Sequence, residues 1–288
     1  MKYLLISNPV AGKNSKKKTK RIASYLSSFG AEVSIETTLY KGNATNLAAQ
    51  AYSRKVDAVI VLSGDGTISE AINGMAGIDV PIGIIPVGTA NVFAGELGIS
   101  ENIYKAADVI LRGKEKRISL GVINGTYFML MASCGFDAEV VSSINLKLKS
   151  KIGKLAYIAS AAAVLRRYNF PEVNVCIDQR REYKGSLVVI SNAKYYAGKF
   201  VMAPHASTDD KFLDVCIFTK RGRGQMLRYL WGLFTKRHHK YKDVVYVKAR
   251  HVRMSSAEKV NVQVDGDPFC RLPADVSVVP KILRVFCP

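Results

Sequence analysis

The stretch from Ala58 to Gly74, AVIVLSGDGTISEAING, constrains the fold more than any other part of the chain. The apolar run from Val59 to Leu62 predicts a buried strand, and a Ser63-Gly64-Asp65-Gly66-Thr67 turn follows it directly. Thr67 and Glu70 have the T-x-x-E spacing of a capping box, which predicts a helix N-terminus at the turn. Such an end suits a phosphate group, through free N–H groups and the helix dipole. A plain strand–turn–helix connection is the alternative, and the order of the three parts favours phosphate binding.

The first 117 residues alternate between predicted strands and helices. Strands are expected at 3–6, 33–37, 59–62 and 81–86, and further helices at 16–28, 44–54, 92–97 and 103–112. This alternation predicts an α/β domain with a parallel, doubly wound sheet. Ligands of such sheets bind beyond the C-terminal ends of the strands. The loops after the four strands, which carry Asn8, Thr38, Asp65 and Thr89, should therefore converge on one cleft.

The pattern changes near Lys116. Asn124-Gly125 separates two apolar runs, 118–123 and 127–131, which is a strong hairpin signal. A long helix at about 153–168 and a second at 225–234 lie among β-rich runs at 173–177, 183–191, 213–218, 244–249, 252–254 and 260–264. These runs predict a mainly antiparallel β-sandwich or barrel-like second domain. We therefore expect domains at 1–117 and 118–288, with a last strand within 276–288 that can return to the first domain.

The charge balance is strongly basic, with 42 Lys and Arg against 23 Asp and Glu and a net charge of +19. This balance implies an anionic partner without choosing among nucleic acid, an anionic membrane and a phosphorylated small molecule. The five cysteines form no C-x-x-C or C-x-x-H motif, which indicates reduced thiols in a cytosolic protein without a zinc site. The N-terminal apolar run is too short for a signal peptide. The longest apolar tract, 155–165, falls short of the roughly 20 residues that span a bilayer.

The turn after the third strand and four other segments, taken in order, resemble the diacylglycerol kinase catalytic-domain family, which includes bacterial soluble lipid kinases and sphingosine kinases. The segment from Ser63 to Gly74 resembles the nucleotide motif of that family. The other matching segments are Asn8-Pro9 with Gly12-Lys13, Pro86-Val87-Gly88-Thr89-Ala90-Asn91, Gly135-Phe136-Asp137-Ala138 and Val264-Asp265-Gly266-Asp267. The resemblance covers nearly the whole chain.

The resemblance implies an ATP- and Mg²⁺-dependent kinase for a lipid hydroxyl, with diacylglycerol or a related lipid as the acceptor. It implies a phosphofructokinase-like α/β domain and a β-sandwich domain, with the active site between them. Asp65 is expected to organise the phosphates and Mg²⁺. The residues expected at the ATP site are Asn8, Thr38, Ser63, Gly64, Asp65, Gly66, Thr67, Ile68, Ser69, Glu70, Thr89 and Asn91.

The chain departs from the family pattern at the general base, a Glu in the third place of a D-G-E motif. Asp267 occupies this place and is shorter by one carbon, roughly 1.5 Å of C–C bond. A base must reach the proton that it takes, so we expect Asp267 to support weak activity or an altered acceptor. The alternative is that Asp265-Gly266-Asp267 is only a polar turn after the strand 260–264.

A second departure concerns the loop from Ser207 to Asp214, which in related bacterial lipid kinases holds a structural Mg²⁺. The matching ligands are the carboxylate of Asp210 and the carbonyls of Ser207 and Phe212, and oxygen ligands suit Mg²⁺. Lys211 stands where the family has Gly, which restricts the turn and brings a positive charge next to the ion. A plain acidic turn is the alternative. Val92, in place of a common Asp, is a further difference.

Basic residues flank the predicted helix 225–234, which also carries Trp231 and Phe234. Such a helix can lie in a membrane interface, and a core helix with solvated flanks is the alternative. The flanking residues are Arg221, Arg223, Lys236, Arg237 and Lys240. Further positive charge comes from Lys147, Lys149, Lys151 and Lys154, just before the helix expected at 153–168, and from Arg166 and Arg167.

The expected partners are a lipid substrate and an anionic membrane surface. A homodimer is one assembly that the chain could form. The protein should be cytoplasmic and peripheral at the membrane. Two other functions stay open: an NAD kinase-like enzyme, and a catalytically weak protein of the same fold that binds anionic lipid or nucleic acid. No recognition motif supports nucleic acid, so we do not expect it as a partner.

Overall fold

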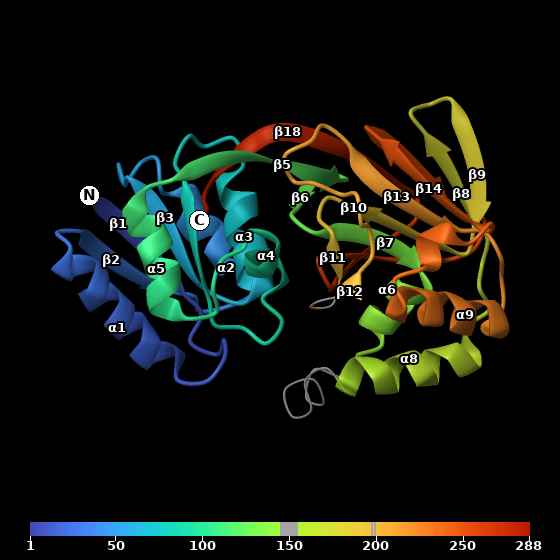
Figure 1. Cartoon of the computed structure of the whole chain (residues 1–288), viewed down its shortest axis with the longest axis horizontal. Coiled ribbons are helices and arrows are strands. Elements are labelled where there is room, and N and C mark those ends of the chain that lie inside the picture. Colours follow the sequence, from blue (N-terminus) through green and yellow to red (C-terminus); the bar gives the residue numbers. More distant parts are fainter. Residues whose placement is uncertain (145–154, 197, 199) are drawn as a thin grey trace. The chain divides into compact units, whose positions relative to one another are not determined.

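The computed structural model describes residues 1–144, 155–196, 198 and 200–288. The chain forms two compact units (Figure 1). The first contains residues 1–120, 208–210 and 279–288, and the second contains residues 121–207 and 211–278. The basic residues predicted at Lys147, Lys149, Lys151 and Lys154 lie outside the described residues, as does the start of the helix expected at 153.

A parallel sheet forms the centre of the first unit. Its strands are β1 (Lys2–Ser7), β2 (Glu32–Thr37), β3 (Ala58–Ser63) and β4 (Ile82–Pro86), in the order β2-β1-β3-β4. Every residue of β3 and β4 is buried. Strands that are covered on both faces have continuous apolar sequences rather than alternating ones, which is why these runs could be recognised. The predicted doubly wound α/β fold is confirmed.

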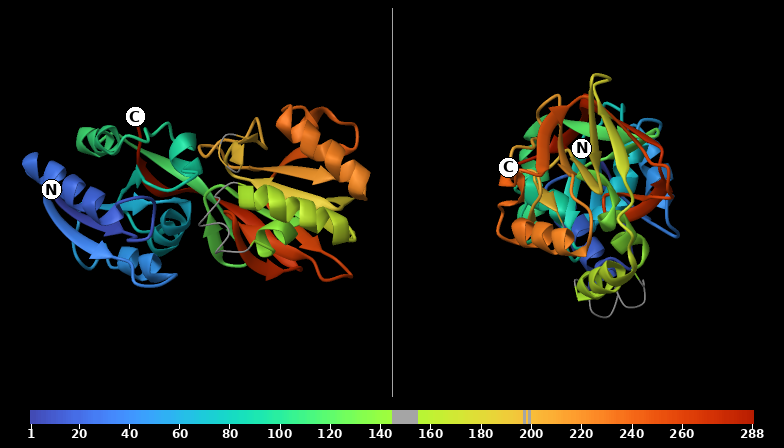
Figure 2. Two further views of the ribbon diagram at one scale, coloured as in Figure 1. Left: turned by 90° about the horizontal axis from the view of Figure 1, so that it is seen from below. Right: turned by 90° about the vertical axis from the view of Figure 1, so that its right-hand side faces the viewer.

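Helices cover both faces of this sheet. Helix α1 (Ser15–Ser28) packs with α5 (Ile103–Arg112), and α2 (Asn43–Ala49) packs with α3 (Asp65–Met75). The two pairs lie on opposite sides of the sheet in the left view of Figure 2. A short helix, α4 (Val92–Glu96), follows β4. The helix predicted at 44–54 is shorter than expected, since its last regular residue is Ala49.

Residues from distant parts of the sequence complete the first unit. Strand β5 (Glu115–Ile123) starts in it, and the long strand β18 (Ala274–Phe286) ends in it, with Val285 paired in parallel to Ile82 of β4. Residues 208–210 bind to β5: Ser119 donates its N–H to the carbonyl of Thr208 at 2.7 Å and its hydroxyl to the carbonyl of Asp210 at 2.6 Å.

The second unit is a β-sandwich with a layer of helices on one side. One sheet has the order β14-β13-β10-β7-β16-β17, and all its pairs are antiparallel. These strands are β7 (Met131–Gly135), β10 (Leu187–Ser191), β13 (Leu213–Phe218), β14 (Val244–Ala249), β16 (Asn261–Val264) and β17 (Asp267–Arg271). The other sheet contains β8 (Val173–Ile177), β9 (Arg181–Gly185), β15 (His251–Ser255) and β18, and β6 (Thr126–Phe128) pairs with β5. A two-stranded ribbon joins β11 (Tyr195–Tyr196) to β12 (Phe200–Val201).

Alternate residues of the central strand β10 face two different apolar cores. Val188 and Ile190 belong to the core between the two sheets, whereas Leu187 and Val189 belong to the core beneath the helices. These helices are α6 (Phe136–Ser142), α8 (Leu155–Arg167) and α9 (Arg223–Phe234), and a 3₁₀ turn, η1 (His238–Lys240), follows α9. The predicted antiparallel sandwich is confirmed.

Two predicted strands of this unit were wrong in extent. The run 183–191 is two strands in different sheets, because the chain crosses between the sheets at Gly185 and Ser186. A Cβ on Gly185 would lie 2.7 Å from a methyl carbon of Ile217, so only glycine fits at this crossing. The run 127–131 is interrupted at residues 129 and 130, whose N–H groups bind the carboxylate of Asp265 instead of a neighbouring strand. The hairpin predicted at Asn124-Gly125 is present, with φ values of 46° and 84°.

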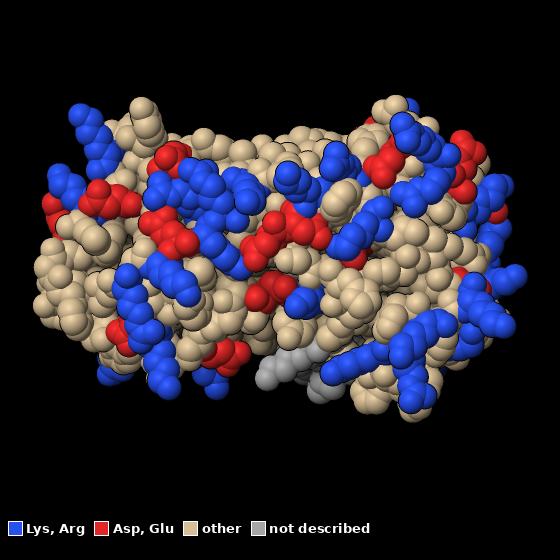
Figure 3. Space-filling model, turned by 45° about the horizontal axis from the view of Figure 1, so that its top comes forward, with Lys and Arg blue, Asp and Glu red and all other residues tan. Residues whose placement is uncertain are grey.

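Lys and Arg are spread over the face shown in Figure 3 and outnumber Asp and Glu there. Among the described residues, no helix combines the length and the apolar character needed to cross a bilayer.

The contact between α2 and α3 gives a prediction about Gly74. A helix-interior Gly→Ala change ordinarily stabilises by about 1 kcal/mol. A Cβ on Gly74 would lie 2.2 Å from the carbonyl oxygen of Thr45, so the substitution overpacks the contact. We expect Gly74→Ala to lower the free energy of unfolding by about 1–3 kcal/mol, measured by urea denaturation. Gly95→Ala in α4 is the control, because a Cβ there meets nothing within 4 Å. Equal stability of the two variants would contradict the prediction.

Candidate active site

The loops at the carboxyl edge of the parallel sheet are joined by side-chain hydrogen bonds. Asn8, after β1, donates through its amide to the hydroxyl of Thr67 at 3.1 Å. The two carboxylate oxygens of Asp65, after β3, accept the N–H groups of Val92 and Phe93 at 3.0 and 3.1 Å. The strand order reverses between β1 and β3, and ligands of open α/β sheets bind at such a switch point. These bonds thus join the loops of Asn8 and Asp65 to each other, and the loop of Asp65 to the segment after β4.

Glycines allow these loops to approach each other closely. A Cβ on Gly88 would lie 2.5 Å from the Cα of Gly64, and a Cβ on Gly12 would lie 2.0 Å from the carbonyl oxygen of Val87. Gly66 differs, because it is exposed and a Cβ on it would meet nothing within 4 Å. Gly12 and Gly88 therefore need to be glycine for packing, while Gly66 leaves open space beside the first residues of the following helix.

Helix α3 begins without a side-chain cap. Its N-cap residue is Gly64, and its first turn starts at Asp65. The predicted capping box of Thr67 and Glu70 was wrong, because the helix begins before Thr67. The Glu70 carboxylate instead accepts the N–H of Ala44 in α2 at 3.3 Å. The first turn of α3 thus offers backbone N–H groups next to the open space at Gly66, which suits a phosphate group.

Two buried polar atoms lie at the same edge without a hydrogen-bond partner among the described residues. They are the hydroxyl of Ser63, at the end of β3, and the side-chain oxygen of Asn91, in the loop after β4. Unpaired buried groups are costly, so a site that offers them a ligand or water is the simplest explanation. The uncapped helix and the open space at Gly66 suit a phosphate group at this edge. Thr38 is buried after β2, and Thr89 is exposed after β4, at the same edge.

Asp65 is mainly a bridge between α3 and α4. Burial raises the pKa of its carboxyl group, while the N–H bonds from Phe93 and Val92 act in the opposite direction. The expected role of Asp65 in organising phosphates and Mg²⁺ stays a prediction. Carboxylate oxygens have more than one lone pair, so bonds to α4 leave acceptor capacity.

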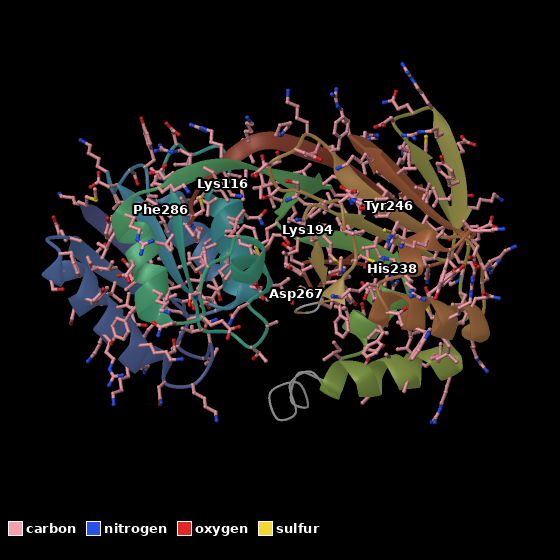
Figure 4. The ribbon with its side chains drawn as sticks, in the orientation of Figure 1. Lys116, Lys194, His238, Tyr246, Asp267 and Phe286 are labelled. Atoms are coloured by element: carbon pink, nitrogen blue, oxygen red, sulfur yellow. The ribbon has the colours of Figure 1, made fainter. Side chains whose placement is uncertain are left out.

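The three residues of the D-G-D segment have different roles: Asp265 and Gly266 form a turn, whereas Asp267 is the candidate general base. Asp265 and Gly266 have φ values of 49° and 88° and form the two-residue turn between β16 and β17, as Asp-Gly pairs commonly do. The Asp265 carboxylate accepts the N–H groups of Met129, Leu130 and Met131 at 3.0, 2.9 and 3.1 Å. Asp267 is exposed at the first position of β17 (Figure 4). The polar turn therefore accounts for Asp265 and Gly266 but not for Asp267.

A buried network behind this turn was missed at the sequence level. The carboxylate of Asp137 accepts short hydrogen bonds from the hydroxyls of Ser133 and Tyr196, and a 3.0 Å bond from the amide of Gln263. The amide oxygen of Gln263 accepts the N–H of Gly266 at 2.8 Å. Burial raises the pKa of Asp137, and its three donors act against that rise. The motif Gly135-Phe136-Asp137-Ala138 was the available signal, but nothing in it indicated Gln263 as a partner.

The predicted metal loop is held by other contacts. Asp209 pairs with Lys116 at 3.3 Å, and the backbone carbonyl of Asp210 accepts the hydroxyl of Ser119. Among residues 1–144, 155–196, 198 and 200–288, no group of three or more His, Cys, Asp or Glu is placed to hold a metal. A Mg²⁺ on the carboxylate of Asp210 and the carbonyls of Ser207 and Phe212 stays a prediction.

The chain is similar to proteins of known families over nearly its full length. Residues 2–123 match the model described as the diacylglycerol kinase catalytic domain, and residues 131–287 match that of the YegS C-terminal NAD kinase beta sandwich-like domain. A Bacillus subtilis protein named diacylglycerol kinase is 33% identical over 99% of this chain and 95% of its own. One of the same name from Mycobacterium tuberculosis is 33% identical over 85% of this chain and 82% of its own. A crystal structure of a diacylglycerol kinase from Bacillus anthracis superposes with a TM-score of 0.82, at 28% identity, and covers 100% of this chain and 97% of that one.

The Asp265 carboxylate gives a prediction about stability. Asp265→Asn keeps the left-handed turn, which Asn tolerates, but replaces one acceptor oxygen with a donor. At least one of the three N–H groups then loses its partner, so we expect the free energy of unfolding to fall by about 1–3 kcal/mol in urea titrations. Asp267→Asn is the matched control and should change stability by less than about 0.5 kcal/mol, because Asp267 is exposed. A larger loss from Asp267→Asn than from Asp265→Asn would contradict this assignment.

Proposed function

The chain belongs to the diacylglycerol kinase catalytic-domain family, and from this premise we propose that it transfers the γ-phosphoryl group of ATP to a lipid hydroxyl. Diacylglycerol is the first acceptor to test, since the relatives described above carry that name. The observation that carries the proposal is the uncapped N-terminus of α3 at the switch point of the sheet, with open space at Gly66.

Each part of the chain has a distinct role in this proposal. The N–H groups of the first turn of α3 bind phosphate oxygens, and the Asn8–Thr67 and Asp65–α4 bonds keep that turn in a fixed orientation. ATP, when bound, supplies the phosphoryl group, and Mg²⁺ offsets the negative charge of the phosphates. Asp267 takes the proton from the acceptor hydroxyl. Phosphoryl transfer depends mainly on positioning and charge, so a shorter carboxylate can serve when the acceptor comes closer.

The function is tested by measuring transfer from labelled ATP to a panel of lipids, with and without Mg²⁺. We expect Mg²⁺-dependent labelling of diacylglycerol or a related lipid. Labelling of NAD instead would indicate the NAD kinase-like alternative. If no acceptor is labelled and binding to anionic lipid falls steeply with salt, the protein is a binding protein of the same fold.

Asp267→Asn tests the base. We expect turnover to fall by about 100-fold or more, because general base catalysis contributes roughly 10²–10⁴-fold. The ATP affinity should stay unchanged, and Asp267→Glu should retain or raise activity, since it restores the residue type of the family. Full turnover by Asp267→Asn would remove Asp267 from this role.

Gly66→Val tests the phosphate site separately from the base. Because the position is open, the variant should unfold at the same urea concentration as the parent protein. Its side chain would occupy the space in front of α3, so we expect ATP affinity to weaken by about tenfold or more in calorimetry, which corresponds to about 1.4 kcal/mol. Gly95→Val is the control, because it also adds an exposed side chain to a helix of the first unit. Unchanged ATP binding by Gly66→Val would place the phosphates elsewhere.

A further inference from the structure

Helix α9 of the second unit has apolar side chains on its buried face and also on an exposed face next to it. Its inner face places Met226 and Tyr229 in the core beneath the sheet, with Leu233 packed against them. Its outer face carries four large apolar side chains with the spacing i, i+3, i+4 and i+7. Their exposed fractions are 55% for Leu227, 37% for Leu230, 64% for Trp231 and 65% for Phe234. Such large apolar surfaces on a helix are normally buried, yet among the residues that the structure describes nothing fully covers these four side chains.

The helix that carries this face is held firmly. The hydroxyl of Tyr229 donates to the carboxylate of Asp243 at 2.7 Å and accepts the N–H of Lys220 at 3.1 Å. A Cβ on Gly232 would lie 2.6 Å from the ring of Tyr241, so the helix packs closely against the segment after it. The exposed side chains are therefore presented by a fixed element, on the same side of the sheet as α8 (Figure 1).

The exposed aromatic rings form a continuous surface. Trp231 and Phe234 are stacked with their ring centroids 5.9 Å apart, and Phe200 of β12 lies 6.5 Å from Phe234 and is 42% exposed. We call these residues the α9 patch: Phe200, Leu227, Leu230, Trp231 and Phe234. Contiguous apolar surface of this kind is uncommon on soluble proteins and marks an interaction site.

The segment that contains α9 is strongly basic. Residues 215–242 contain no Asp or Glu, and all their Lys and Arg side chains are exposed: Lys220, Arg221, Arg223, Arg228, Lys236, Arg237, Lys240 and Lys242. The acidic residues at the two ends of this segment, Asp214 and Asp243, are already paired with neighbouring side chains. Asp214 is fully buried and pairs with Lys248 at 3.1 Å, and Asp243 pairs with Arg228 and Tyr229. All exposed Lys, Arg, Asp and Glu side chains of this segment are thus positively charged.

We propose that the α9 patch is the surface by which the second unit docks on an anionic lipid bilayer. Trp and Phe side chains on a basic helix enter the interface between headgroups and acyl chains, while Lys and Arg bind the lipid phosphates. A second copy of the chain fits less well, because a two-fold contact would bring two basic segments together. The docking proposal rests on the proposed function in one respect: a lipid kinase must reach a substrate that lies within a membrane.

The patch contains the one tryptophan of the chain, which provides a direct probe. With vesicles of phosphatidylglycerol and phosphatidylcholine and no ATP, we expect the emission of Trp231 to shift to shorter wavelength and the protein to sediment with the vesicles. Vesicles of phosphatidylcholine alone should bind far more weakly, and added salt should weaken binding to the anionic vesicles.

Two variants and one control locate the surface. Leu227→Ser combined with Phe234→Ser should weaken vesicle binding by about tenfold or more, and Lys236→Glu combined with Arg237→Glu should do the same at low salt. Tyr52→Ser, at an exposed aromatic residue of the first unit, should bind as the parent protein does. All of these side chains are exposed, so circular dichroism and urea denaturation should be unchanged.

Each outcome bears on the proposal. The absence of both the spectral shift and sedimentation with anionic vesicles would overturn it, as would full binding by the Leu227/Phe234 variant. Self-association in sedimentation velocity that the same substitutions abolish, without vesicle binding, would assign the patch to a second copy and would also overturn it. Vesicle binding without any ATP turnover would support this proposal while the proposed kinase function fails, and turnover on a short-chain, water-soluble diacylglycerol without vesicle binding would show the reverse.

Discussion

The contact on which the candidate nucleotide site depends is the pair of hydrogen bonds from Val92 and Phe93 to the carboxylate of Asp65. These bonds fix the start of α4 to the start of α3, so the loops after β3 and β4 share one orientation. The glycine contact between Gly64 and Gly88 permits this closeness, and the Asn8–Thr67 bond adds the loop after β1. Backbone N–H groups can serve as a preorganised anion site only when their directions are fixed in this way.

Three carboxylates of the chain hold neighbouring segments in place by accepting several hydrogen bonds each. Asp65 accepts from α4, Asp265 accepts three N–H groups at the start of β7 and just before it, and Asp137 accepts from two hydroxyls and an amide. Each is held by several donors, which offsets the cost of removing a charge from water. Asp267 differs, because it is exposed at the end of a turn that Asp265 and Gln263 hold in place.

Much of the fold could be predicted because its signals are local. Continuous apolar runs followed by glycine turns indicated the parallel sheet, and Asn124-Gly125 indicated a hairpin that is present. The errors arose where a distant partner decides the local structure. The strand expected at 127–131 is broken by Asp265, which lies more than 130 residues along the chain, and Gln263, one of the three partners of Asp137, lies 126 residues away from it. Asp65 was recognised as important, but its bonds to α4 could not be inferred from the spacing of the motif.

The position of the last strand, β18, affects how the protein folds during its synthesis. Strand β4 is buried along its whole length, and part of its cover comes from residues 279–288, through the pairing of Ile82 with Val285. On the ribosome, the N-terminal sheet therefore emerges with an apolar strand at its margin long before that cover has been made. Domains that are synthesised first usually fold first, and an unpaired strand margin invites wrong partners. During synthesis the first unit therefore stays incomplete, with β4 lacking this neighbour, until the last residues of the strand β18 have been made.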